Sequence, residues 1–159
     1  FRAGLVGSES RRLLDLLSDP ERCAVNLVAT AEEMPFNETA EMYDRIRDSL
    51  QMPLGYLFVN RVHPGGPAAL DAATLAEAIA ASGAAVDPCL ADALDRAREE
   101  IGWSEINRHY LARMEERIDL PRIEIPFSFT EEFAAAELAA VADGIRAGLQ
   151  AIPKETQRG

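Results

Sequence analysis

Two short apolar runs with an amphipathic segment between them form the clearest pattern in this chain. The runs cover residues 24–29 and 56–59. Between them, Asn37 or Thr39 is placed to cap a helix with apolar residues at spacings of four, namely Met42, Ile46 and Leu50. Two apolar strands joined by a helix predict a parallel sheet with a right-handed crossover, because both faces of such strands are covered.

A further helix is predicted before the first strand. Ser8 or Ser10 can cap it, and it runs through Asp19, where Pro20 disfavours helical geometry in the residue before it. Its apolar side consists of Leu13, Leu14, Leu16 and Leu17.

A helical region is predicted between the second and third strands. A loop at residues 63–67 precedes an alanine-rich helix over residues 68–82, which Gly83 ends. Asp87-Pro88 starts another helix, in which Gly102 is a candidate break. The charged residues of this region are expected to form a solvated face; they are Asp95, Arg96, Arg98, Glu99, Glu100, Arg113, Glu115, Glu116 and Arg117.

The last part of the chain predicts an edge strand and a final helix. Residues 122–127 alternate polar and apolar positions. Thr130 is placed to cap the helix, and its inward residues are expected to be Leu138, Val141, Ile145 and Leu149. The predicted fold class is α/β: one domain over residues 1–152, with a parallel sheet flanked by helices, and a flexible tail at residues 153–159.

Length and charge narrow the classes of function. The chain has 159 residues, enough for one domain with a core, and no apolar run approaches the roughly 20 residues that span a bilayer. A net charge of −11 would repel phosphate backbones and anionic lipids. Cys23 and Cys89 have no metal-binding spacing and are expected to be buried thiols. These features predict a cytoplasmic protein that binds no nucleic acid and does not insert into a membrane.

Three strand ends supply candidate binding residues. Ligands of parallel sheets bind outside the carboxyl ends of the strands. Glu32, Asn60, Arg61 and residues 127–130 are expected at these ends, and parallel strands would bring them to one edge. We therefore predict a pocket there.

Each candidate has a functional and a structural interpretation. The amide of Asn60 suits the edge of an adenine, or it satisfies the backbone of a turn. Glu32 is a possible acceptor for ribose hydroxyls or a loop amide, or a solvated carboxylate. Phe127 and Phe129 either wall a base or are buried aromatic residues at the edge of the sheet.

Common catalytic motifs are absent from the sequence. There is no G-x-x-x-x-G-K-[ST], no G-x-G-x-x-G and no G-x-S-x-G. His63 and His109 have no ligand partners at a useful spacing, so both are expected to be structural or exposed. On these residues alone the chain has neither catalytic machinery nor a metal site.

Three segments, in order, resemble the carboxy-terminal half of ArsA-type ATPases. They are LVATAEEMPFNET at residues 27–39, VNRV at 59–62 and LPRIEIPF at 120–127. The likeness extends from about Leu13 to Leu149. The family includes arsenite-pump ATPases and targeting ATPases for tail-anchored membrane proteins. The resemblance implies part of a P-loop-type parallel sheet, in an ATPase that dimerises around its nucleotides.

The resemblance also assigns nucleotide contacts. In that family the Glu after the first of these strands and the Asn of the V-N-x pattern contact the nucleotide, which here are Glu32 and Asn60. We include Arg61, the neighbour of Asn60, among these candidate nucleotide contacts. The proline-led loop after the last strand helps to form the adenine pocket and maps onto residues 126–133. Its candidate residues are Pro126, Phe127, Ser128 and Phe129.

The phosphate-binding loop and switch aspartate of the family lie upstream of the matching segments, and the Cys-x-x-Cys of the targeting ATPases is absent. We therefore expect a piece of a longer protein: the adenine-side portion of an ArsA-like ATPase that, when complete, binds and hydrolyses ATP with Mg²⁺. The chain alone is expected to be inactive.

The alternative is a truncated, nucleotide-independent interaction domain that pairs with an ATPase subunit. In either case another polypeptide segment is expected to complete the sheet, because parallel sheets seldom leave exposed edges. The expected assembly is a homodimer or heterodimer of ATPase subunits.

Overall fold

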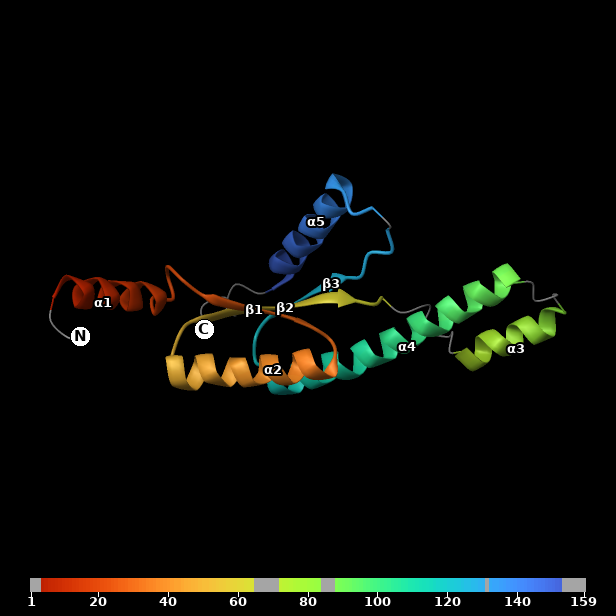
Figure 1. The fold of residues 1–159 in the computed structure, drawn as a ribbon, viewed down its shortest axis with the longest axis horizontal. Helices are drawn as coiled ribbons and strands as arrows, with labels where there is room; N and C mark the ends of the chain where they lie inside the picture. Colours follow the sequence, from red (N-terminus) through yellow and green to blue (C-terminus); the bar gives the residue numbers. More distant parts are fainter. Residues whose placement is uncertain (1–3, 65–71, 84–87, 131, 153–159) are drawn as a thin grey trace.

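The computed structural model describes residues 4–64, 72–83, 88–130 and 132–152. The chain is an α/β protein, as predicted (Figure 1). Its elements are α1 (Leu5–Leu17), β1 (Val25–Thr30), α2 (Glu33–Asp44), the π-helix η1 (Arg45–Leu50), β2 (Leu54–Val62), α3 (Ala72–Ser82), α4 (Pro88–Arg117), β3 (Arg122–Pro126) and α5 (Ala135–Ala151).

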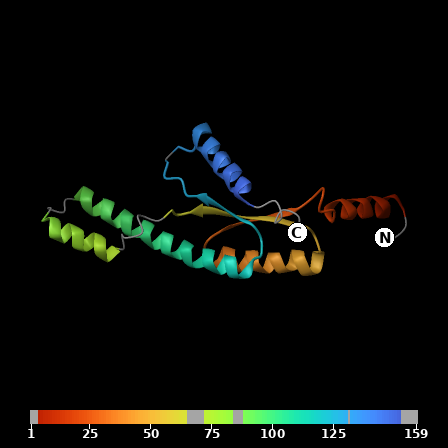
Figure 2. The ribbon, with the colours of Figure 1, turned by 180° about the vertical axis from the view of Figure 1, so that it is seen from behind.

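The three strands form an open, all-parallel sheet in the order β1-β2-β3. Val28 of β1 pairs with Phe58 of β2, which pairs with Ile123 of β3. Right-handed crossovers that proceed in the same direction place their helices on the same face. Accordingly, α2 and α4 lie on one face of the sheet and α5 lies on the other (Figures 1 and 2). The predicted parallel sheet, with helices between its second and third strands, is confirmed.

The hydrophobic core lies between the sheet and the pair α2 and α4. Leu57 and Val59 of the central strand are 1% and 0% exposed, and Met114 of α4 is 0% exposed. Burying a side chain of this size stabilises the fold by about 1.5–3 kcal/mol. Around them lie Leu27, Ala29, Ala31, Phe36, Tyr43, Ile46, Val62 and Ile118. An ion pair between Asp44 and Arg117 joins α2 to α4 at the rim of this layer.

Helix α2 differs from the prediction in its start and in its buried face. It begins at Glu33, so that Asn37 and Thr39 lie inside the helix rather than at its cap. Its buried residues are Phe36, Thr39, Ala40 and Tyr43. Of the residues predicted to face inward, Ile46 is buried, but Met42 and Leu50 are 46% and 54% exposed. In a π-helix the hydrogen bonds span five residues, so across η1 a spacing of four no longer marks one face.

The outer helices also correct the prediction. Helix α1 begins at Leu5 rather than at a serine cap, and it extends away from the sheet (Figure 1). Its leucines Leu13 and Leu14 are 57% and 63% exposed. Helix α4 continues through Gly102 without a break, because one glycine costs only about 1 kcal/mol in a helix interior. The described part of the predicted 68–82 helix ends before Gly83, as expected, whereas residues 68–71, Asp87 and the tail at 153–159 lie outside the described residues.

Helix α5 begins five residues after the predicted cap. Its first turn is held by Glu137, whose carboxylate accepts the Ala134 N–H at 3.0 Å, whereas the Thr130 hydroxyl donates to the carbonyl of Glu132. Gly148 brings α5 close to β3, since an added Cβ would lie 3.1 Å from Ile123 Cγ2. The inward residues are only half-buried, and Leu138 is 60% exposed.

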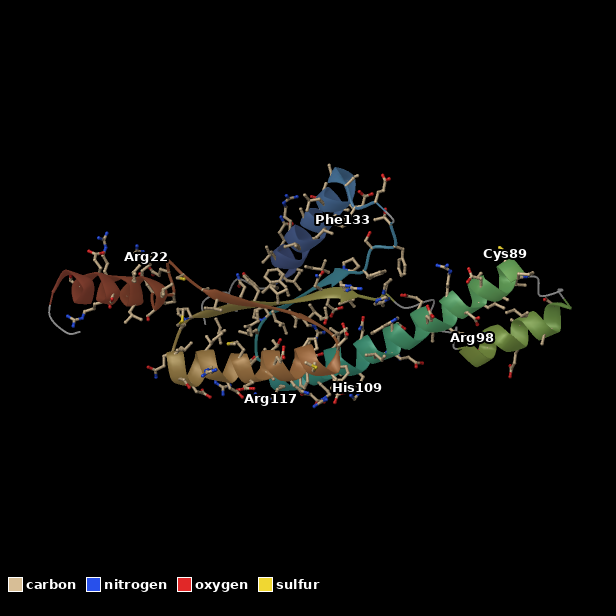
Figure 3. The ribbon with its side chains drawn as sticks, in the orientation of Figure 1. Arg22, Cys89, Arg98, His109, Arg117 and Phe133 are labelled. Atoms are coloured by element: carbon tan, nitrogen blue, oxygen red, sulfur yellow. The ribbon has the colours of Figure 1, made fainter. Side chains whose placement is uncertain are left out.

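Helices α3 and the first half of α4 project beyond the carboxyl edge of the sheet (Figures 1 and 2). Cys89 lies near the tip of this projection and is exposed, which contradicts the expectation of a buried thiol (Figure 3). Among the described helices, none combines the length and apolar composition needed to cross a membrane.

Replacement of Met114 by alanine tests the position of the core. Because the side chain is fully buried between α4 and the sheet, Met114→Ala should lower the free energy of unfolding by about 2–5 kcal/mol. Met42→Ala, the same change at a 46% exposed position of α2, should change it by less than about 0.5 kcal/mol. Chemical denaturation of both variants measures the difference, and equal losses would contradict this description of the core.

Candidate functional site at the carboxyl edge of the sheet

The carboxyl ends of the three strands meet at one edge and carry the predicted residues. Asn60 is the register partner of Thr30, which lies two positions before Glu32. Val62 pairs with Pro126, and the Phe127 N–H donates to the Val62 carbonyl at 2.8 Å. Three segments that are distant in the sequence therefore come together at this edge.

Asn60 and Arg61 lie inside β2 rather than after it, and they form an irregularity in the strand. The register between β2 and β3 shifts between Val59 and Val62, and Arg61 has a φ of +57°, which is uncommon for a residue other than glycine. Such bulges redirect side chains. The Arg61 guanidinium lies over the ring of Phe127, with 5.4 Å between Cζ and the ring centroid.

Asn60 and Glu32 lie in different local settings at this edge. Asn60 is exposed and lies within β2 rather than in a turn. Glu32 has extended backbone angles and precedes α2, but its side chain caps no N–H of that helix.

An aromatic cluster centred on His63 lies beside these residues, and the sequence did not predict it. The imidazole stacks on Phe127, with 4.5 Å between ring centroids and 11° between planes, and on Trp103 at 5.8 Å and 18°. Phe129 meets both His63 and Phe127 edge-on. Phe127 is half-buried in the cluster, whereas Phe129 is 66% exposed and is not a buried aromatic residue.

His63 is tied to α4 by a close contact with Glu100. Its Nδ1 lies 2.6 Å from Oε2 of Glu100, and the side chains are 11% and 24% exposed. The expectation of a solvated face is therefore wrong for Glu100. The other oxygen of this carboxylate is buried and has no partner among the described residues. His63 is structural, and His109 is exposed, as expected.

Asn107 holds α4 to the ends of two strands. This 3% exposed side chain accepts the His63 N–H at 2.8 Å and donates to the Ala31 carbonyl at 3.0 Å. A signal for it exists in the sequence: the buried stripe of Ile118 and Met114 continues toward the helix start at spacings of three and four, through Leu111 to Asn107 and Ser104. A polar residue on a buried stripe indicates a hydrogen-bonded core position.

A cavity of about 440 Å³ opens next to the edge, between α4 and β3. Its lining includes His63, Asn107, Arg108 and Arg122, but none of the residues predicted to bind nucleotide. Arg122 is already engaged, because it donates to the Leu111 carbonyl and to Glu124 at 2.9 and 3.0 Å. This cavity therefore lies on the α4 side of the edge and does not include the residues predicted to line a pocket.

Arg47 and Asp48 have shifted pKa values, but they lie in η1, away from this edge. Arg47 donates to both carboxylate oxygens of Asp48, at 2.7 and 2.8 Å. These hydrogen bonds lower the pKa of Asp48 and raise that of Arg47. Both side chains are exposed, and the pair lies outside the candidate site.

No protein-family model matches the chain, and no curated protein shows significant similarity to it. The resemblance to ArsA-type ATPases therefore depends on its three motifs.

The Asn107→Asp variant tests the link between α4 and the edge. It keeps an acceptor for the His63 N–H but places a carboxylate oxygen against the Ala31 carbonyl, so the free energy of unfolding should fall by about 1–3 kcal/mol or more. Asn37→Asp adds the same charge at an exposed position of α2 and should be nearly neutral. If denaturation showed equal effects, Asn107 would not be the link that we describe.

Proposed function

We propose that this chain is the adenine-side portion of an ArsA-like ATPase and that its strands belong to a P-loop-type sheet. The observation that carries the proposal is the convergence of Glu32, Asn60 and Phe127 at one sheet edge. These residues come from the three segments that resemble the family. The edge of a parallel sheet is also where such folds bind ligands.

The edge residues fit the base and ribose of ATP. The Asn60 amide offers a donor and an acceptor, as the edge of an adenine requires. The rings of Phe127 and Phe129 offer apolar walls, and the Glu32 carboxylate accepts hydrogen bonds from hydroxyl groups. Arg61 lies against Phe127, where it borders the same space.

Phosphates and Mg²⁺ would be held by other parts of the complete protein. Among the described residues, no group of three or more His, Cys, Asp or Glu side chains is placed to hold a metal ion. Mg²⁺ neutralises phosphate charge in ATPases of this class. We assign to this chain the binding and orientation of the base, and to the complete dimer the coupling of hydrolysis to conformational change.

ATP turnover by the full-length gene product tests the proposal. Asn60→Ala should raise the KM for ATP about tenfold with little change in kcat, because it removes hydrogen bonds to a part of the substrate that does not react. The control, Asn37→Ala, changes an exposed asparagine of α2 and should leave KM unaltered. Absence of both turnover and ATP binding in the full-length product would contradict the proposal and favour the nucleotide-independent interaction domain.

We further propose that another polypeptide segment completes the sheet along β1. This strand lies at one side of the sheet, and Val28, on the face opposite α2, is 67% exposed. The edge has no charged residue or proline within Val25–Thr30. By contrast, β3 carries Pro126 and an ion pair between Arg122 and Glu124 at 3.0 Å, and such features discourage pairing with a further strand.

Hydrogen exchange along β1 tests this second proposal. In the full-length product the β1 amides should be protected as well as those of β2, whereas in the 159-residue chain the outer amides should exchange quickly. Equally fast exchange of β1 in both proteins would contradict the pairing.

A further inference from the structure

His63 lies where β2, α4 and the segment after β3 meet. Its backbone N–H is bound by Asn107, its imidazole nitrogen by Glu100, and its ring stacks on Phe127. Only 11% of the side chain is exposed. Its position therefore depends on three elements at once.

Glu100 and Trp103 lie on the part of α4 that leaves the sheet. Toward the end of α4, Asn107 and Met114 are buried against the strands. Toward its start, the helix projects past the carboxyl edge beside α3 (Figures 1 and 2). The contacts of Glu100 and Trp103 with His63 thus lie at the root of the projection.

The contact between His63 and Glu100 is not explained by stability alone. Burial of a carboxylate costs free energy unless its oxygens are hydrogen-bonded. Oε1 of Glu100 is buried and has no partner among the described residues, although Oε2 lies 2.6 Å from His63. A carboxylate with one unpaired buried oxygen contributes little to the stability of a helix. Its short contact with His63, however, defines the orientation of the imidazole.

We propose that His63 is a positioning residue that couples α4 to the Phe127–Phe129 segment. Glu100 and Trp103 fix the imidazole, and the imidazole fixes the ring of Phe127. A movement at the root of α4 then displaces this ring. Because coupling between two sites is reciprocal, a ligand that stacks on Phe127 restrains α4 in return. The coupling to nucleotide rests on the proposed function, whereas the positioning of Phe127 does not.

Two measurements without nucleotide test the positioning. Trp103 is the single tryptophan of the chain, so the tryptophan emission of the 159-residue chain comes from this residue. In His63→Ala, Trp103 emission should shift to longer wavelength, and the Phe127 amide, which donates to the Val62 carbonyl, should exchange about tenfold faster or more. His63→Phe, which keeps a stacked ring, should restore part of the protection. Glu100→Ala should act in the same direction as His63→Ala, and Glu99→Ala, at the exposed neighbouring position, should have no effect.

Unchanged emission and exchange in His63→Ala would overturn the proposal. If that variant fails to fold, Glu100→Ala decides by the same two measurements, since its side chain lies nearer the surface.

ATP binding by the full-length product separates the two proposals. If neither the parent nor Asn60→Ala binds ATP, the proposed function fails, and the exchange rates still decide the role of His63. If ATP binding is weakened by Asn60→Ala but is identical in His63→Ala and the parent, the coupling fails and the proposed function stands. Weaker binding in His63→Ala and Glu100→Ala, with Glu99→Ala unchanged, supports the coupling.

Discussion

The parallel pairing of β2 with both of its neighbours is the constraint on which the rest of this structure depends. It buries Leu57 and Val59 on the helix-covered face and brings three carboxyl ends to one edge. A parallel sheet requires long crossovers, and here both crossover helices lie on the same face, where α2 and α4 share one core. The candidate site is therefore a consequence of topology before any particular side chain is considered.

Polar contacts then determine which side chains are fixed at the carboxyl edge of the sheet and which are exposed there. Asn107 uses both ends of its amide to fix α4 beneath the ends of β1 and β2, and His63 extends the link to Phe127. These groups are buried or nearly so, where an unpaired partner is costly and the geometry is correspondingly well defined. By contrast, the side chains of Asn60 and Phe129 are exposed to solvent.

The two sides of the sheet are covered unequally. Helix α5 packs against β3, but Val28 of β1 and the leucines of α1 remain exposed. The edge strand β3 carries Pro126 and the Arg122–Glu124 ion pair, whereas β1 carries neither a charged residue nor a proline within Val25–Thr30.

The sequence by itself determined the element types, the parallel sheet and the edge at which Glu32, Asn60 and Phe127 lie, because apolar runs and their spacing reflect burial directly. It did not determine the start of α2 at Glu33 or its buried residues Phe36, Thr39, Ala40 and Tyr43, and it gave no sign of the π-helical turn at Arg45–Leu50, which alters the helical repeat beyond α2. Only the tertiary structure decided the bulge at Arg61 and the pairing of His63 with Glu100. These features arise from strand register and from contacts between residues far apart in the chain, which no local spacing encodes.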